Sequence, residues 1–498
     1  VYVVGVRGSR SEITVPDEIE GHNVARVATG AFLGNKNIKK GSFGGEIAIE
    51  PRAFFGCTAL ESINLKNAIS IGADAFAGCT KLRSVELKDI VNIGDSAFNR
   101  CGALTSVKIA NGESDITIGY AAFANCAKLS SVDIDRTVLF DAGSYAIFEN
   151  SLNVSSLHLK NFECGDYSRK IVEMFGGTPA LSSLIIDSID TVGEGLCEEL
   201  STVTMVRFND VATLSIGARA FKACEKLTEV ILPAAVYEVG DEAFSGSNIT
   251  SFDGSALISI GKKAFADCKN LSSFVFNKDT ELTKISDSAF MNCAELKSIT
   301  IPTEVVVLGE HAFSGCGKLA AVTFDDESTI SSIGYSVFEG CKRLSSINLP
   351  ANVRAIGARA FFGCAALSDV TLPAELANIG EESFAESGLT EIKLPASVTS
   401  IGCGAFADCE KLRALSVPFV GGSREANRYL PYIFGAESVD FVLGVVPMSL
   451  KTVTVTDSTE APNNAFMGCA DIVNAIYVNG LNFIGENAFR DCRSLATI

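Results

Sequence analysis

The strongest constraint on the fold is a short repeat in which Phe is followed three residues later by Cys and, in most copies, three residues further by Leu. "AFAGCTKL" (75–82) and "AFADCEKL" (405–412) are two of its copies. The Phe recurs at steps of mostly 21 to 25 residues along the 498-residue chain, and we expect Phe175, Phe434 and Leu196 to fill its position in irregular copies. A period this short indicates a solenoid, because one unit cannot bury its apolar face without its neighbours.

Each position of the repeat has an expected structural role. The consensus reads I-G-x-x-A-F-x-x-C-x-x-L-x-x-V-x-L-P, and the alternation of its last apolar positions predicts a short strand. The stretch from Gly to Cys suits a single 3₁₀ or α turn. The Gly, four residues before Phe in twelve units, predicts a positive φ or a close backbone contact. Phe, Cys and Leu are predicted to form buried columns, for example at Phe76, Cys79, Leu82, Phe313, Cys316, Leu319, Phe361, Cys364 and Leu367.

These roles predict a repeat solenoid of about twenty coils. We expect a curved, right-handed coil with a parallel sheet of short strands on one face and short helical turns or strands on the other. The regularity of the repeat divides the chain into a capping unit (1–34), regular repeats (35–134), irregular repeats (135–215), regular repeats (216–417), a long insert unit (418–462) and terminal repeats (463–498) expected to be cut within the array.

Cysteine usage admits three interpretations. Thirteen of the sixteen cysteines lie three residues after Phe, and the exceptions are Cys164, Cys197 and Cys403. Structural zinc favours paired ligands such as C-x₂-C, a spacing that does not occur, so no metal is expected. A disulfide ladder is disfavoured because Asn or Ser replaces Cys in four coils, although a single bridge such as Cys403 to Cys409 stays open. We therefore interpret the position as one for a small, buried residue that can donate a hydrogen bond.

Composition and missing motifs argue against several classes of function. The formal net charge is −18 and no run of five basic residues occurs, which opposes binding to nucleic acid. No run of eighteen apolar residues is present to span a bilayer. The motifs G-x-S-x-G, H-E-x-x-H, G-x-x-x-x-G-K-[ST] and G-x-G-x-x-G do not occur, so we expect neither an enzyme nor a cofactor. Two carboxylates acting on a glycosidic bond would leave no motif, and that class stays open.

The consensus resembles the BspA-like, or Treponema-type, leucine-rich repeat over most of the chain. "ITVPDEIEGHNVARVATGAFLG" (13–34) is similar to the usual first unit of that family. "VPFVGGSREANRYLPYIFG" (417–435), followed by "VPMSLKTVTV" (446–455), resembles its longer insert unit. The resemblance implies a leucine-rich-repeat-like fold without a catalytic centre, in an extracellular protein of the bacterial cell surface.

The activity implied by this resemblance is adhesion. The expected partner is a host matrix protein, another cell-surface protein or a glycan, and we expect a monomer. One alternative is a passive stalk that displays another domain. A second alternative is an accessory binding module of a glycan-degrading surface enzyme.

Two groups of residues are candidates for binding. Outward positions of successive strands should form two columns, one from Ser62 to Ser298 and the other from Asn64 to Thr300. Apolar and charged residues typical of interfaces gather in the middle of these columns and in the insert. They could instead be ordinary strand formers, or residues that close a wider coil. The candidates are Ile185, Met205, Arg207, Glu229, Ile231 and Val275 on the strands, and Arg424, Arg428, Tyr429 and Tyr432 in the insert.

Overall fold

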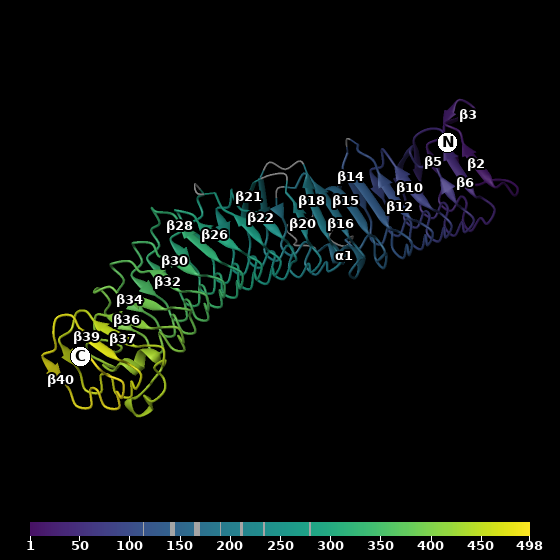
Figure 1. The fold of residues 1–498 in the computed structure, drawn as a ribbon. Helices are drawn as coiled ribbons and strands as arrows, with labels where there is room; N and C mark the ends of the chain where they lie inside the picture. Colours follow the sequence, from purple (N-terminus) through teal and green to yellow (C-terminus); the bar gives the residue numbers. More distant parts are fainter. Residues whose placement is uncertain are drawn as a thin grey trace. The chain divides into compact units, whose positions relative to one another are not determined.

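The computed structural model describes residues 1–112, 114–139, 145–163, 170–189, 191–209, 213–232, 235–277 and 280–498, apart from the side chains at 162, 163 and 213. Cys164 lies outside the described residues. The chain forms two compact units, Val1–Ala234 and Ala235–Ile498. Each unit is a stack of coils whose strands lie side by side on one face (Figure 1). The predicted solenoid of about twenty coils with parallel strands is confirmed.

The main row of strands follows the predicted strand segment of each repeat, with one strand per coil. Successive strands of this row pair in parallel wherever a pairing is recorded. In the first unit the row consists of β2 (Glu12–Val15), β6 (Lys40–Phe43), β8 (Ser62–Ile63), β10 (Ser84–Leu87), β12 (Ser106–Ile109), β14 (Ser131–Leu139), β15 (Ser156–Glu163), β16 (Ser183–Asp187), β18 (Met205–Asn209) and β20 (Glu229–Ile231). In the second it consists of β22 (Ser251–Asp253), β24 (Ser273–Val275), β26 (Ser298–Ile301), β28 (Ala321–Phe324), β30 (Ser346–Asn348), β32 (Asp369–Thr371), β34 (Glu391–Lys393), β36 (Ala414–Val417), β37 (Thr452–Val455) and β39 (Asn474–Tyr477).

A second row of mostly shorter strands lies just before the turn that carries Phe, in many coils directly before the recurring Gly, and its strands also pair in parallel. In the first unit it comprises β1 (Tyr2–Val3), β5 (Arg26–Val27), β7 (Ile47–Ile49), β9 (Ala68–Ile71), β11 (Asn92–Ile93), β13 (Ile116–Ile118), β17 (Thr191–Val192) and β19 (Thr213–Ile216). In the second it comprises β21 (Ala235–Val239), β23 (Ser259–Ile260), β25 (Lys284–Ile285), β27 (Val307–Leu308), β29 (Ser332–Ile333), β31 (Ala355–Ile356), β33 (Asn378–Ile379), β35 (Ser400–Ile401), β38 (Glu460–Ala461) and β40 (Phe483–Ile484).

Few other elements occur. An antiparallel hairpin, β3 (Glu18–Ile19) and β4 (His22–Asn23), lies in the first coil. The helical segments are α1 (Ile171–Phe175), η1 (Leu430–Phe434) and η2 (Val439–Phe441). Within the described ranges, none of the helices has the length and apolar character that crossing a membrane would require.

Two neighbouring strands of the first unit are longer than the rest. Residues 131–139 alternate between buried and partly exposed positions along the whole of β14. The first half of β14 pairs with β12 and its second half pairs with β13, so β14 joins the two rows. β15 continues alongside it with one register shift. This pair gives the first unit its widest continuous strand surface.

The interior of both units is a column of Phe rings. Phe54, Phe76 and Phe98 are fully buried, and their ring centroids lie 5.1 Å apart in near-parallel planes. Phe290 and Phe313 of the second unit stack in the same way at 5.3 Å. All nine residues predicted as Phe, Cys and Leu core positions are buried, and the prediction is confirmed.

The irregular coils follow the same column with one correction. Phe148 stacks on Phe175 at 5.3 Å, which confirms Phe175 in the Phe position. Leu196 does not hold this position in its coil. The amide of Cys197 donates to the carbonyl of Ala220, the bond that a Phe amide makes elsewhere, so Cys197 holds it instead. The prediction failed because both residues are buried and apolar, and the sequence alone does not fix the register.

The stretch from Gly to Cys is not a continuous helical turn as predicted. Ala75 N–H donates to the Gly72 carbonyl within the coil, whereas Asp74 N–H donates across to the Asp95 carbonyl of the next coil. This alternation continues through the turn. Every second amide therefore ties one coil to the next, and the backbone needs left-handed residues to present it. Asp74 has a φ of 57°.

The recurring Gly is explained by close packing rather than by positive φ. Gly72 and Gly94 have ordinary backbone angles, and the left-handed residues lie two positions before and two after Phe. A Cβ on Gly72 would lie 2.5 Å from the backbone nitrogen of Pro51 in the preceding coil. Of the two predicted reasons, close backbone contact is confirmed and positive φ is wrong.

The cysteines cap backbone carbonyls inside the stack. The thiol of Cys79 donates to the Phe54 carbonyl of the preceding coil at 3.3 Å, and Cys364 donates to the Phe338 carbonyl at 3.2 Å. Ser151, which replaces Cys in its coil, makes the same bond to Phe123 at 2.8 Å. The fifteen described cysteines are free. The predicted role of a small, buried donor is confirmed.

Candidate functional site

The outward positions of the main strand row form the predicted columns. Ser84, Ser106 and Ser131 are consecutive register partners, and the next column runs through Lys108 and Asp133. Pairing continues to β20 in the first unit and restarts at β22 in the second. Because each coil contributes the same backbone, the side chains at these positions alone decide the chemistry of the face.

Five of the six strand candidates lie together on three neighbouring strands. Ile185, Arg207 and Ile231 are consecutive register partners on β16, β18 and β20. Met205 pairs with Glu229 in the adjacent column. Arg207 and Glu229 are exposed, and the three apolar side chains are partly exposed. We call these five residues the β16–β20 patch.

Val275 is exposed but does not belong to this patch. It lies on β24 of the second unit, where its register partner is Asp253. The expectation that it extends the patch came from reading the columns across the boundary between the units. Val275 is therefore not counted as part of the site.

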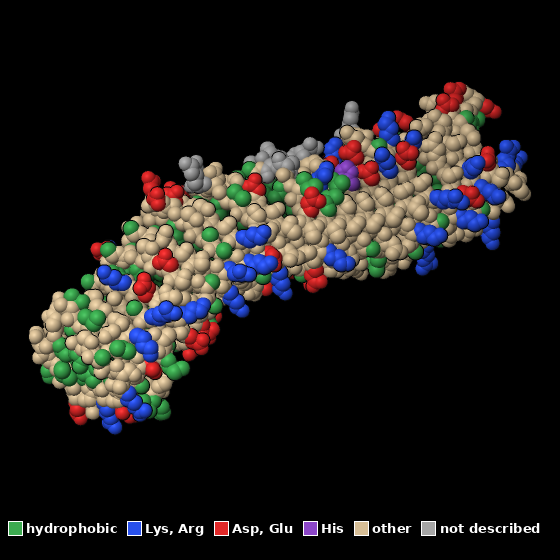
Figure 2. Space-filling model, in the orientation of Figure 1, with side chains coloured by type: hydrophobic (Ala, Val, Ile, Leu, Met, Phe, Trp, Pro, Cys, Tyr) green, Lys and Arg blue, Asp and Glu red, His purple; other side chains and the backbone are tan. Residues whose placement is uncertain are grey.

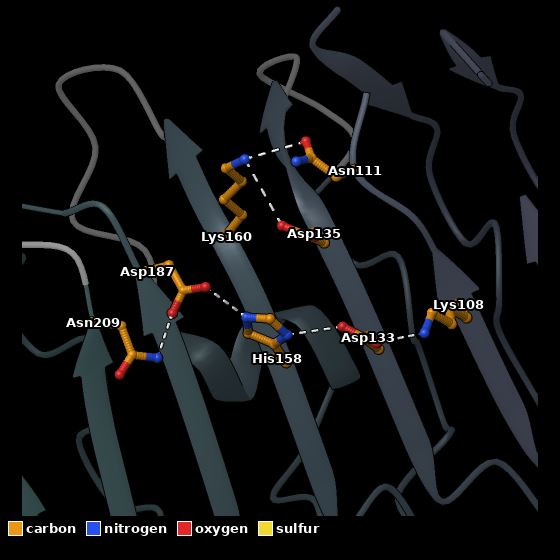
Figure 3. A network of polar contacts seen from close by, with 8 residues as sticks. All are labelled: Lys108, Asn111, Asp133, Asp135, His158, Lys160, Asp187 and Asn209. Atoms are coloured by element: carbon orange, nitrogen blue, oxygen red, sulfur yellow. Dashed lines mark hydrogen bonds and ion pairs between the residues drawn. The ribbon is translucent and has the colours of Figure 1, made fainter. Parts of the chain in front are cut away.

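A polar network borders the patch and was not predicted as a site (Figure 3). His158 on β15 lies between two carboxylates, with Nδ1 2.8 Å from Asp133 Oδ1 and Nε2 2.8 Å from Asp187 Oδ2. Asn209 donates to the other oxygen of Asp187 at 2.7 Å, and Lys108 lies 3.8 Å from Asp133. The network therefore crosses five adjacent strands, from β12 to β18.

A second polar contact group lies further along the same strands. Lys160 Nζ is 3.8 Å from Asp135 and donates to the Asn111 amide oxygen at 3.2 Å. Figure 3 shows this group above the histidine and pointing outward from the same sheet face. Acidic and basic side chains gather around the histidine in the space-filling view, with apolar side chains beside them (Figure 2).

The environment of His158 favours its charged form. Partial burial of the imidazole lowers its pKa, but its hydrogen bonds to Asp187 and Asp133 and the attraction of their negative charges outweigh this effect, and the pKa of His158 is raised overall. The side chain of Asp187 is only 14% exposed. The imidazole, hydrogen-bonded to two carboxylates, forms a polar border, and the register partner of His158 on the next strand is Ile185 of the patch.

Sequence reasoning found part of this arrangement. It placed Asp133 and His158 in one column but did not pair them, although adjacent register positions with opposite charge were the signal. Asp187 and Asn209 were missed because they belong to a third column, which exists only where the strands are five residues long or more.

The insert candidates divide into exposed and buried residues. Arg424 and Arg428 are ion-paired, with Asp457 at 2.6 Å and Glu460 at 2.9 Å. Both arginines line a cleft of about 440 Å³. Tyr432 lies beside this region and packs against a small apolar cluster.

Tyr429 is a core residue and cannot contact a partner. Its side chain is 7% exposed, and its hydroxyl donates to the Ala436 carbonyl at 3.1 Å. It closes the wider coil together with Val442. The expectation that Tyr429 binds is corrected for this reason.

In the part of the chain that the structure describes, no three His, Cys, Asp or Glu side chains come together as a metal site. The Asp133–His158–Asp187 group is held by hydrogen bonds and ion pairs between its own members.

Solved structures of repeat proteins resemble this chain at low identity. A leucine-rich repeat protein from Bacteroides ovatus is 21% identical, with 90% of this chain and 94% of that chain covered and a TM-score of 0.35. A leucine rich cell surface protein from Faecalibacterium prausnitzii is 20% identical, with 83% and 89% covered and a TM-score of 0.31. The pneumococcal vaccine antigen PcpA is 16% identical, with 74% and 84% covered and a TM-score of 0.38. Curated proteins give no match.

The repeat itself identifies the family. The model of the BspA type leucine rich repeat region matches residues 47–168, 190–320, 283–413 and 447–498, which together make up more than half of the chain. The match covers β18 and β20, two of the three strands that carry the β16–β20 patch. The chain therefore belongs to the BspA type leucine-rich repeat family.

Proposed function

We propose that this chain is a non-catalytic cell-surface protein that binds a protein partner through the β16–β20 patch. The observation that carries the proposal is the row Ile185–Arg207–Ile231, in which two partly exposed apolar side chains flank an exposed arginine on register-paired strands. Members of this family typically serve in binding and adhesion. The location at the cell surface is part of the proposal and rests on the family.

The chemistry of the patch fits a protein partner. Arg and Met are enriched at the centres of protein interfaces, where apolar side chains surrounded by polar groups contribute most of the affinity. Arg207 forms no ion pair with any residue that the structure describes. The partner should therefore present an apolar surface with a carboxylate placed to meet this guanidinium.

The network around His158 supports the same site. It holds Asp133 and Asp187 in fixed positions along one edge of the patch. Polar groups that are already paired cost less to bring close to a partner than free charges, because their hydrogen bonds remain satisfied. A rigid edge of this kind excludes water from the apolar centre.

The test is a binding screen with matched variants. The protein is applied to an array of extracellular matrix proteins and purified surface proteins, and binders are measured by biolayer interferometry. The variant Met205→Ala/Arg207→Ala/Ile231→Ala should weaken binding by roughly 30-fold or more, as expected when hot-spot residues are removed. Circular dichroism and melting temperature confirm that the variant is folded.

The control uses the same strand row in the second unit. Thr300, Thr323 and Asn348 are exposed outward residues on β26, β28 and β30. Their triple alanine variant should bind as the wild type does. Equal binding by the patch variant with an intact fold would reject the site, and an array without any binder would favour a passive stalk.

A further inference from the structure

The insert forms a second candidate site, separate in chemistry from the β16–β20 patch. The loop after β36 (residues 419–428) and the turn after β37 (residues 456–462) enclose a cleft of about 440 Å³. β36 and β37 are parallel register partners, so their following segments emerge at the same edge of the sheet. This volume is within the range of small-ligand sites, roughly 300–1,000 Å³.

The charges of the cleft cancel. Arg424 donates to both the backbone carbonyl of Asp457, at 2.8 Å, and its carboxylate, at 2.6 Å. Arg428 pairs with Glu460 at 2.9 Å. Two cations and two anions give a formal charge of zero, so neither a phosphate nor a cationic ligand gains from net attraction.

Several polar groups in the cleft remain available. Only one carboxylate oxygen of Asp457 and one of Glu460 are used in the ion pairs. Thr459 and Asn479 also line the cleft. In the continuous described segment 280–498, the Thr459 hydroxyl and the Asn479 side-chain oxygen have no recorded hydrogen-bond partner.

The Arg424 side chain is also held in place by an aromatic ring. The Arg424 guanidinium lies 5.4 Å from the ring centroid of Phe419, whose side chain is 3% exposed. The ring therefore supports the arginine from below, and a ligand contacts the guanidinium rather than the ring. Held in this way, Arg424 presents fixed donors at modest entropic cost.

We propose that this cleft binds a neutral glycan. A ligand that suits it must be polar, uncharged, and able both to donate to carboxylates and to accept from guanidinium groups. Adjacent hydroxyl groups of a sugar ring do both, because each hydroxyl is donor and acceptor. Apolar ligands would cover the two ion pairs and the free carboxylate oxygens without hydrogen-bonding to them, and the cost of that desolvation would exceed what they gain.

The test uses an array of neutral and charged glycans, followed by isothermal titration with the retained neutral oligosaccharide. We expect retention of uncharged sugars that survives 10 mM inorganic phosphate. Asp457→Asn should weaken binding at least about tenfold, as loss of a hydrogen bond to a charged group does, and Asn479→Ala, which removes a neutral exposed group, should weaken it by roughly threefold to tenfold. Glu375→Gln, which removes an exposed carboxylate from a comparable ion pair with Arg354, should leave binding unchanged.

Three results would overturn the proposal: no retained neutral glycan, retention of sialylated or sulfated glycans alone, or folded Asp457→Asn and Asn479→Ala variants that bind like the wild type. The Met205/Arg207/Ile231 variant is included in the same experiment. It should bind the glycan normally, so failure of the glycan site and failure of the protein site remain distinguishable.

Discussion

The strand faces of the two units differ although their backbones follow the same pattern. On the first unit, β14 to β20 carry a polar network around His158 beside apolar and arginine side chains. On the second, β26 to β30 carry the small polar residues Thr300, Thr323 and Asn348 in equivalent outward positions. The comparison teaches that inward positions carry the fold and that outward positions are free to differ.

The packing of the interior explains why inward positions do not have this freedom. A Phe ring contacts the ring before it and the ring after it, and a thiol caps the carbonyl of the preceding Phe. Changing an inward residue therefore disturbs three coils at once. Changing an outward residue disturbs a cross-strand pair. The following predictions test this difference, beginning with the largest expected effect.

Removal of one ring from the Phe column should destabilise both units alike. Phe76→Ala in the first unit and Phe313→Ala in the second should each lower the free energy of unfolding by about 3–5 kcal/mol, because both side chains are fully buried. Urea unfolding followed by circular dichroism measures the loss. A loss below about 1 kcal/mol in either unit would break the claim that they share one interior.

A Cβ on the recurring Gly should be the next most harmful change. Gly357→Ala would place a Cβ 2.7 Å from the Gly334 carbonyl carbon, and we expect a loss of about 1–3 kcal/mol. The control is Gly317→Ala, where nothing lies within 4 Å, and its effect should be small. Similar melting temperatures for the two variants would show that close packing does not explain the repeat.

Substitutions at the Cys position should be less destabilising when the new side chain can donate a hydrogen bond. Cys364→Val removes the thiol donor from the Phe338 carbonyl, which still accepts from the Cys341 amide, and should cost about 0.5–1.5 kcal/mol. Cys364→Ser keeps a donor, as the native Ser151 does, and should cost less. The ranking is checked by thermal melting, and a reversed order would mean that shape rather than hydrogen bonding selects Cys.

The smallest expected effect is a pH dependence of the free energy of unfolding, which comes from His158 in the first unit. Because the pKa of His158 is raised in the folded state, its stabilising contribution is complete below the unfolded pKa and is lost as pH rises through the folded pKa. The pairs are partly exposed, so we expect less than about 1 kcal/mol. Urea unfolding at pH 5 and pH 8.5 should show that the wild type loses this contribution at the higher pH. The His158→Asn variant should not show the loss.

The parts of the fold that depend on repetition could be predicted from sequence. Most coils repeat Phe, Cys and Leu at the same positions, so the core and the strand columns could be predicted by counting residues. The predicted register was wrong at Leu196, because Leu196 and Cys197 are adjacent apolar residues and either could fill the position. Only the backbone hydrogen bonds show that Cys197 fills it.

The sites were less predictable because they depend on contacts between coils. Asp187 reaches His158 only because β16 is long enough to add a third column. Arg424 and Asp457 lie 33 residues apart within the insert and meet because β36 and β37 are adjacent. The burial of Tyr429 depends on how the insert closes, which composition does not reveal.

Hydroxyl-radical footprinting with a partner from the array can locate the contact surface, because Met205 lies in the proposed patch and Met448 lies outside it. Met205 lies in the β16–β20 patch, and Met448, which is 77% exposed, lies in the insert. If recognition occurs on the first unit's strand face, the bound partner will protect Met205 from oxidation and leave Met448 as reactive as before. Unchanged oxidation of Met205 in the saturated complex would contradict the account.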